Sequence, residues 1–156
     1  MSLSIELVAA PTDDARALVG ELEAELDGKY SPEQRHGLSL DRLFRPGILF
    51  FIARSGAEAV GCGGVAFDDG FAEVKRMYVR PHARGGGVAR AILSRLEAET
   101  RARGVTRLTL ETGDALHAAI RLYERAGFVP CAAFGAYAAM PPHTIVRSLF
   151  FEKAIL

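Results

Sequence analysis

The chain has 156 residues, with 19 basic and 19 acidic side chains and a formal net charge of zero. This length is typical of one domain, and we expect residues 1–156 to fold without a disulfide or a metal. The balanced charge argues against a nucleic-acid partner. No apolar run approaches the roughly 20 residues of a membrane span, and no signal peptide is evident. These features favour a cytoplasmic globular protein with no membrane partner.

The N-terminal third predicts a strand, a helix and an irregular connection. Residues 5–8 are apolar enough for a short strand. Thr12 is an N-cap followed by acidic residues, and Gly28 ends the helix that follows. Residues 31–46 are less regular, although residues 39–44 are suited to a second short helix.

Strands and two further helices are predicted over the rest of the chain. The first of these helices ends at Gly104, and the second, which carries apolar residues from 116 to 123, ends at Gly127. Glycines inside one strand indicate a bulge or a close backbone approach. The strands are expected at residues 48–53, 59–67, 71–79, 105–112, 128–131 and 148–153. The order of elements predicts a mixed α/β sheet with helices on its faces.

The cysteines and histidines show no pattern that predicts a special site. Cys62 and Cys131 are far apart, and we interpret both as buried thiols, with a disulfide as the alternative. We expect Cys62 to be a core residue rather than a nucleophile. The four histidines lack metal-ligand spacing, so no metal site is expected.

A glycine-rich turn, residues 85–87, joins a predicted strand to a predicted helix. The first turn of a helix has free N–H groups and a partial positive charge, and glycines let an anion approach them. The turn therefore favours a phosphate or pyrophosphate ligand over a plain connection. A P-loop is excluded because Val88 and Ala89 follow the glycines. A dinucleotide fingerprint fits poorly because Arg90 replaces its last glycine.

Two motifs resemble those of the GNAT superfamily of N-acyltransferases. Arg84-x-x-Gly87-x-Ala89 is similar to the family signature Gln/Arg-x-x-Gly-x-Gly/Ala, and the segment Leu122 to Phe128 is similar to the second motif, Leu-Tyr-x-x-x-Gly-Phe. The resemblance extends over roughly residues 5–153, and several short segments also resemble a bacterial subgroup of uncharacterised members. It implies a mixed, mostly antiparallel sheet of about seven strands, splayed at the acetyl-CoA cleft, with about four helices on its faces.

The resemblance also implies where acetyl-CoA binds. The glycine turn would hold the pyrophosphate, and the strand before it would pair through its backbone with the pantetheine arm. Residues 75–107 hold nine basic and two acidic side chains, a local positive charge suited to phosphates. Leu116 departs from the family, because many members have an asparagine there that contacts the cofactor. The implied cofactor residues are Met77, Tyr78, Val79, Arg84, Gly85, Gly86, Gly87, Val88, Ala89, Arg90 and Tyr123.

The implied reaction transfers an acetyl group from a thioester to an amine. An alkylamine has a pKa of about 10, so a proton acceptor is needed as well as a proton donor for the departing thiolate. Tyr123 is the implied donor, a role compatible with a core position. Glu73 is the candidate base, with a water relay or a solvent-exposed ion pair as the alternatives. In a regular strand, side chains alternate between the two faces, so Glu73 would lie on the other face from Val74, Arg76 and Tyr78.

The acceptor is expected to contact Tyr30, Arg35, His36, Arg76, Phe134 and Tyr137. Arg35 and Arg76 are suited to a carboxylate on the acceptor, although ordinary ion pairing is the alternative. The predicted activity is acetyl-CoA-dependent acetylation of a primary amine of a small molecule. Two alternatives are left open: a non-catalytic acyl-CoA-binding or sensing module, and an acetyltransferase for protein N-termini or lysines. A homodimer is also left open.

Overall fold

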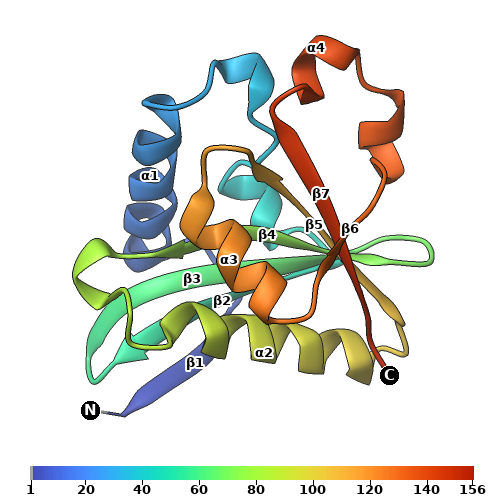
Figure 1. Cartoon of the computed structure of the whole chain (residues 1–156). Helices are drawn as coiled ribbons and strands as arrows, with labels where there is room; N and C mark the ends of the chain where they lie inside the picture. Colours follow the sequence, from blue (N-terminus) through green and yellow to red (C-terminus); the bar gives the residue numbers. More distant parts are fainter. Residues whose placement is uncertain (1) are drawn as a thin grey trace.

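The computed structural model describes residues 2–156 and contains one seven-stranded sheet, with strand order β1-β2-β3-β4-β5-β7-β6 (Figure 1). Neighbouring strands are antiparallel except for the parallel pair β4 and β5. This arrangement confirms the mixed, mostly antiparallel sheet expected from the sequence. The strands are β1 Leu3–Val8, β2 Ile48–Ser55, β3 Glu58–Phe67, β4 Ala72–Val79, β5 Arg107–Gly113, β6 Val129–Pro130 and β7 Ser148–Ala154.

Four α-helices accompany the sheet, together with short 3-10 turns. The α-helices are α1 Asp13–Asp27, α2 Val88–Ala102, α3 His117–Arg125 and α4 Pro142–Ile145. The second short helix expected near residue 40 is the 3-10 helix η2, Asp41–Phe44. Two short pieces between β6 and β7, η4 (Gly135–Ala139) and α4, lie outside the sequence expectations. Each is too short for an apolar repeat to develop.

The helices form two layers around the sheet. Helix α1 covers one face, and α2 and α3 lie on the other (Figure 1). Residues of β2 alternate between the layers, because Phe50 and Ile52 pack with α1 whereas Phe51 packs with α2. The Thr12 hydroxyl accepts a hydrogen bond from the amide of Ala15, which caps α1 as predicted. Both layers therefore bury the apolar faces of the helices they contain.

A bulge in β4 reverses the alternation of its side chains. Arg76 has a φ of 55°, and the pairing register with β3 shifts beside it. Val74, before the bulge, packs in the α2 layer, whereas Tyr78 packs in the α1 layer. Arg76 also faces α1, where it pairs with Glu23. The expectation of strict alternation is therefore wrong, because an extra residue in a strand switches the faces that follow it.

Strands β4 and β5 are joined only at their beginnings. Ala72 pairs with Leu108 and Glu73 with Thr109, and no later pair joins these strands within residues 2–156. The Thr109 hydroxyl adds a hydrogen bond of 2.8 Å to the carbonyl of Ala72. Beyond this point the strands separate, so backbone groups along the rest of β4 face an opening between them.

Both cysteines are free thiols, but only one is buried. Cys62 lies in the α1 layer, and burial raises the pKa of its thiol to about 12. Cys131 is partly exposed, so the expectation that it is buried is wrong. Among residues 2–156, none of the helices combines the length and hydrophobicity needed to cross a bilayer.

A pair of glycine substitutions tests the packing at the opening between β4 and β5. A Cβ at Gly113 would clash with the Tyr30 hydroxyl, whereas one at Gly20, on the exposed side of α1, would meet nothing within 4 Å. We expect Gly113→Ala to lower the free energy of unfolding by about 1–3 kcal/mol through overpacking. Gly20→Ala should raise it by up to about 1 kcal/mol through helix propensity. Urea denaturation of both variants measures these changes. An equal change in the free energy of unfolding for the two variants would contradict the close packing of Gly113 against Tyr30.

Candidate active site

Two cavities lie where β4 and β5 separate. The larger has a volume of about 590 Å³ and the smaller about 120 Å³. The larger extends along the end of β4, the glycine turn and the start of α3, and the smaller lies over the α1-facing side of β4 and β5. The side chains common to both cavities are Leu22, Leu26, Met77, Leu116, Ala119 and Tyr123. A ligand in one cavity can therefore reach a ligand in the other.

The glycine turn forms one wall of the larger cavity. Gly85 and Gly87 have φ values of 84° and 83°, and a Cβ at either would face open space. Gly87 is the N-cap of the 15-residue helix α2 and provides no side-chain cap. The first N–H groups of α2 are therefore available to an anion beside the turn. This geometry fits the pyrophosphate of a CoA molecule.

The larger cavity brings together nearly all of the expected cofactor residues. Gly86 is the exception, because it does not line the cavity. Arg84 donates a hydrogen bond of 2.9 Å to the carbonyl of Val79, which ties the turn to the end of β4. The residues that line the cavity as expected are Met77, Tyr78, Val79, Arg84, Gly85, Gly87, Val88, Ala89, Arg90 and Tyr123.

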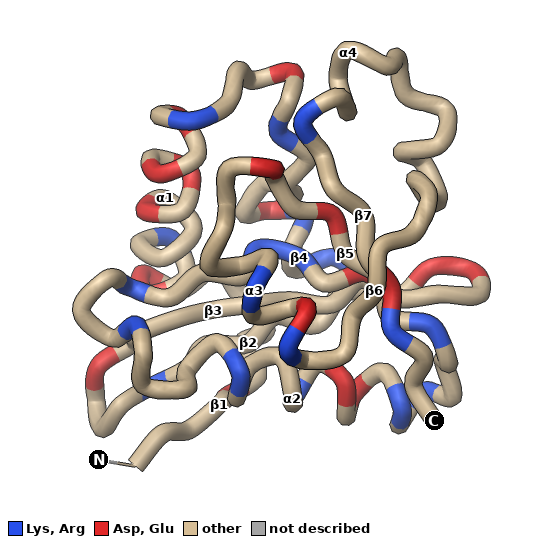
Figure 2. The backbone as a smooth tube through the Cα atoms, viewed as in Figure 1, with Lys and Arg blue, Asp and Glu red and all other residues tan. Residues whose placement is uncertain are grey.

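Acidic residues lie along α1 and basic residues lie in and after β4 (Figure 2), and the two groups form ion pairs. The hydrogen bond from Arg80 lowers the pKa of Glu21 below its ordinary value. The local positive charge expected from the sequence is thus partly neutralised by α1, and the helix amides of α2 gain importance for binding phosphate. The ion pairs are Arg80–Glu21, Arg76–Glu23 and Arg84–Glu25.

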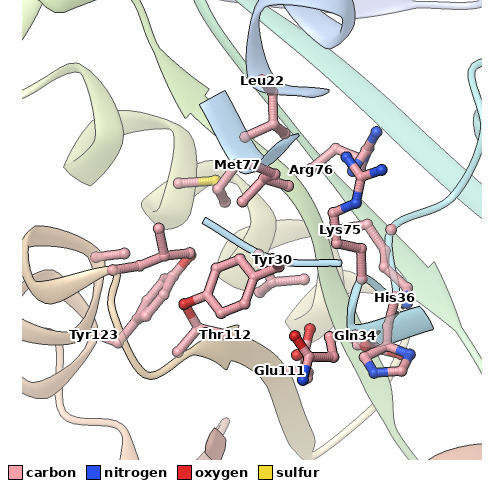
Figure 3. A pocket seen from close by; sticks show the side chains of 18 of the residues that line it. Leu22, Tyr30, Gln34, His36, Lys75, Arg76, Met77, Glu111, Thr112 and Tyr123 are labelled. Atoms are coloured by element: carbon pink, nitrogen blue, oxygen red, sulfur yellow. Dashed lines mark ion pairs between the residues drawn. The ribbon is translucent and has the colours of Figure 1, made fainter. Parts of the chain in front are cut away.

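The smaller cavity contains most of the expected acceptor residues (Figure 3). Phe134 does not line it but packs against Tyr137, with ring centroids 5.2 Å apart. The expected residues that line it are Tyr30, Arg35, His36, Arg76 and Tyr137, together with the candidate base Glu73. These side chains come from the connection after α1, from β4 and from η4.

Glu73, Lys75 and Tyr137 form a hydrogen-bonded network in the smaller cavity. The Tyr137 hydroxyl donates to a Glu73 oxygen at 2.6 Å, and the Lys75 ammonium lies 3.0 Å from that oxygen. Lys75 also donates to the Tyr137 hydroxyl at 3.1 Å. Burial, followed by the charge of Glu73, raises the pKa of Tyr137 far above its ordinary value. The Glu73 carboxylate is therefore held by one cation and one phenol.

Arg35 and Arg76 are bound within the protein. Both guanidinium groups pair with Glu23 of α1, and Arg35 also pairs with Asp27. Gly37 packs directly against the Arg76 guanidinium, so a side chain there would displace it. These contacts correspond to the ordinary ion pairing considered for the two arginines. They hold the connection after α1 against the side of the smaller cavity.

Two hydrogen bonds tie residues of the smaller cavity to neighbouring segments. The ring of His36 lies 2.6 Å, through Nε2, from the carbonyl of Thr144. The Tyr30 hydroxyl accepts a hydrogen bond of 2.9 Å from the amide of Ala115. The first contact joins the connection after α1 to α4, and the second joins the beginning of that connection to the segment before α3. The cavity is therefore bounded by segments that are far apart in the sequence.

Tyr123 lies on the boundary between the two cavities. Its side chain comes from α3, is 5% exposed, and stacks edge-on against Phe128 with centroids 5.9 Å apart. Burial raises the pKa of Tyr123 far above its ordinary value, and the negative charge of Glu111 adds to the effect. The phenol is therefore protonated at neutral pH.

Four polar residues of the smaller cavity lie outside the sequence-predicted site: Gln34, Lys75, Glu111 and Thr112. Glu111 accepts a hydrogen bond of 2.7 Å from the Ser148 hydroxyl, and burial raises the pKa of its carboxyl group. A signal for Glu111 exists in the sequence. Glu111 is a carboxylate near the carboxyl end of β5, the strand that runs beside β4 and parallel to it. Parallel strands commonly place their binding groups at this end.

The chain has clear relatives. The model of the acetyltransferase (GNAT) family matches residues 16–128. A protein named IAA acetyltransferase from Azospirillum brasilense is 42% identical over 149 residues, which cover 94% of each chain. A solved structure described as a putative acyl-CoA N-acyltransferase from Klebsiella pneumoniae is 34% identical, with a TM-score of 0.78 over 99% of this chain and 98% of that one.

A structure from Thermoplasma acidophilum, described as PaiA N-acetyltransferase in complex with coenzyme A, shares the fold. Its TM-score is 0.71 over 99% of both chains, at 16% identity. The family match covers both motifs found in the sequence, and the structure places the glycine turn and Tyr123 on the walls of one cavity. The chain therefore belongs to the GNAT acetyltransferase family and is an N-acyltransferase that uses acetyl-CoA as its cosubstrate.

Proposed function

We propose that this enzyme transfers the acetyl group of acetyl-CoA to a primary amine of a small molecule. The observation that carries the proposal is the position of Tyr123, which separates a large cavity bordered by the glycine turn from a small polar cavity. In this arrangement the cofactor occupies the large cavity and the acceptor occupies the small one. Acetyl-CoA supplies the acetyl group as an activated thioester.

The residues of the larger cavity have distinct proposed roles. The amides around Gly87 and the start of α2 bind the pyrophosphate, and the unpaired backbone at the end of β4 binds the pantetheine arm. The protonated Tyr123 hydroxyl donates its proton to the departing sulfur. Leu116, which lines both cavities, adds apolar surface at their junction. An apolar junction excludes water from the transferred acetyl group.

The size and charge of the smaller cavity support a small amine as the acceptor. Its volume of about 120 Å³ suits a compact molecule. A protein N-terminus or lysine brings an attached chain that needs further room, so these alternatives are less well supported. Glu73 and Glu111 provide two carboxylates for an ammonium group. One of them is suited to accept its proton.

A panel of acceptors tests this function. The protein is incubated with acetyl-CoA and with amino acids, polyamines, arylamines and short peptides, and free thiol is measured over time. We expect thiol release with at least one small amine and slower release with peptides. Binding of CoA without turnover of any acceptor would favour the sensing module, and turnover of peptides alone would favour protein acetylation.

Replacing Tyr123 by phenylalanine tests its role as the proton donor. The variant keeps the apolar contacts, including the stacking on Phe128, but removes the hydroxyl. We expect kcat to fall by about 10²–10⁴-fold, the usual contribution of acid–base catalysis. The Kd for CoA, measured by calorimetry, should change by less than about threefold, since catalysis is lost without binding. Equal losses of kcat and CoA affinity would show that Tyr123 only packs.

Gly87→Ala tests the glycine turn as the pyrophosphate site, with Gly70→Ala as its control. Both glycines have positive φ, 83° and 84°, and a Cβ at either would meet nothing within 4 Å. Both variants should lose about 1–2 kcal/mol of stability from the left-handed backbone. Only Gly87→Ala should weaken CoA binding, by about tenfold or 1.4 kcal/mol, because Gly70 lies in the β3–β4 hairpin. If the Gly87→Ala and Gly70→Ala variants bound CoA with equal affinity, the glycine turn would not be the pyrophosphate site.

A further inference from the structure

The bulge in β4 places Arg76 on the wall of the smaller cavity. In a regular strand Arg76 would share the face of Val74, which packs in the apolar α2 layer. The bulge turns Arg76 toward α1 instead, so that it lines the cavity together with Lys75. Among residues 2–156, Arg76 is the one residue other than glycine with a positive φ. A backbone conformation of this kind persists mainly where a binding or catalytic site requires it.

The Arg76 guanidinium is buried but only partly bonded. The residue is 7% exposed, and its Nη2 atom pairs with Glu23. Its Nε atom is buried and has no hydrogen-bond partner among residues 2–156. Burial lowers the pKa of Arg76, the direction expected for a cation that is incompletely compensated. A buried charged donor without an acceptor is costly, so an oxygen supplied by a ligand would be bound favourably.

Arg35 repeats this arrangement beside Arg76. Glu23 bridges the two guanidinium groups with one carboxylate oxygen on each, which holds them side by side. The Nε atom of Arg35 is also buried without a partner in the described part of the chain. The side chains of Glu23 and Asp27 are 43% and 64% exposed, and water weakens the attraction of such carboxylates for a cation. The two guanidinium groups therefore retain N–H donors and charge for one further anion.

The charged residues that line the cavity divide into a positive end and a negative end. Arg35 and Arg76 lie together, and Lys75 is paired with Glu73 at 3.0 Å. Glu111 lines the same cavity, and none of the ion pairs formed among residues 2–156 includes it. In the view of Figure 3, Lys75 lies between Arg76 and Glu111. A molecule that fits this cavity is therefore small and carries both charges.

We propose that Arg76, with Arg35 beside it, binds a carboxylate of the acceptor, so that the acceptor is a small amino acid; this inference rests on the proposed amine acetylation. The planar guanidinium groups donate N–H hydrogen bonds to the carboxylate oxygens. Met77, which follows Arg76, lines both cavities, so a carboxylate at Arg76 leaves the amine of a short molecule near their boundary. Arg76 is thus a residue that determines specificity and takes no part in proton transfer.

An amino acid and its amide form a matched pair that tests the carboxylate site. The best amino acid of the acceptor panel and its amide differ in the charged group and have nearly the same size. We expect kcat/KM to be about 10–100-fold higher for the acid, the range for a hydrogen bond to a charged group. Equal values for acid and amide, or turnover of other amines with no amino acid, would overturn the inference and leave amine acetylation standing.

Arg76→Gln and Gly37→Ala test the guanidinium in two ways. The first variant removes it, and the second displaces it without changing any charge, because a Cβ at Gly37 would clash with its Nη1 atom. We expect the ratio of kcat/KM for acid over amide to fall toward one in both, mainly through KM for the acid. An unchanged ratio in both variants would overturn the inference.

Gly28→Ala is the matched control for the glycine substitution. A Cβ at Gly28 would lie 3.7 Å from the Glu25 carbonyl, an ordinary contact, and Gly28 lines neither cavity. This variant should keep both the rate and the ratio of acid over amide. A ratio that fell equally in Gly28→Ala and Gly37→Ala would overturn the specific role of the Arg76 guanidinium.

NMR of arginine Nε–H groups tests carboxylate binding without turnover. The CoA complex is titrated with sodium propionate, with propionamide and sodium chloride as controls, and the Arg76 signal is assigned by its loss in Arg76→Gln. We expect this signal to shift and saturate with propionate alone. An unmoved signal, or an equal shift with chloride, would overturn the inference even if amines are acetylated. A saturating shift with no turnover of any amine would support the carboxylate site and contradict the proposed function alone.

Discussion

The short pairing between β4 and β5 is the constraint on which both cavities depend. Two residue pairs join these parallel strands at their beginnings, and the strands then diverge. Divergence leaves backbone groups of β4 without strand partners, which favours a ligand that can supply them. It also opens the sheet beside the N-terminus of α2 and beside Tyr123 of α3. In the proposed function, the cofactor and the acceptor both bind at this one interruption of the sheet.

The acidic residues of α1 neutralise part of the positive charge carried by residues 75–107. Acidic residues of α1 pair with Arg76, Arg80 and Arg84, which follow one another in and after β4. These pairs fix α1 and the connection after it against the sheet, and so shape the wall between the two cavities. In the proposed function, phosphate recognition then falls mainly to backbone N–H groups at the glycine turn, where geometry rather than net charge selects the ligand.

Local features were predictable from the sequence, whereas long-range ones were not. The glycine turn and Tyr123 each depend on contiguous residues, so their motifs located them on the correct elements. The bulge at Arg76 was not predictable, because a single extra residue leaves the apolar pattern of a strand almost unchanged. The position of Glu111 at the end of a strand was a signal, but its approach to Glu73 depends on the parallel register of β4 with β5, which no local pattern records. The contact of His36 with Thr144 joins residues 108 positions apart.

Hydrogen–deuterium exchange with and without CoA is the most direct test of the separated strands as the cofactor site. Peptides that cover residues 77–90 and the start of α3 should exchange more slowly in the complex, because the ligand occupies backbone groups left free between β4 and β5. The edge strand β1, on the far side of the sheet order, should exchange at the same rate in both states. Unchanged exchange over residues 77–90 at saturating CoA, with protection elsewhere, would contradict this site.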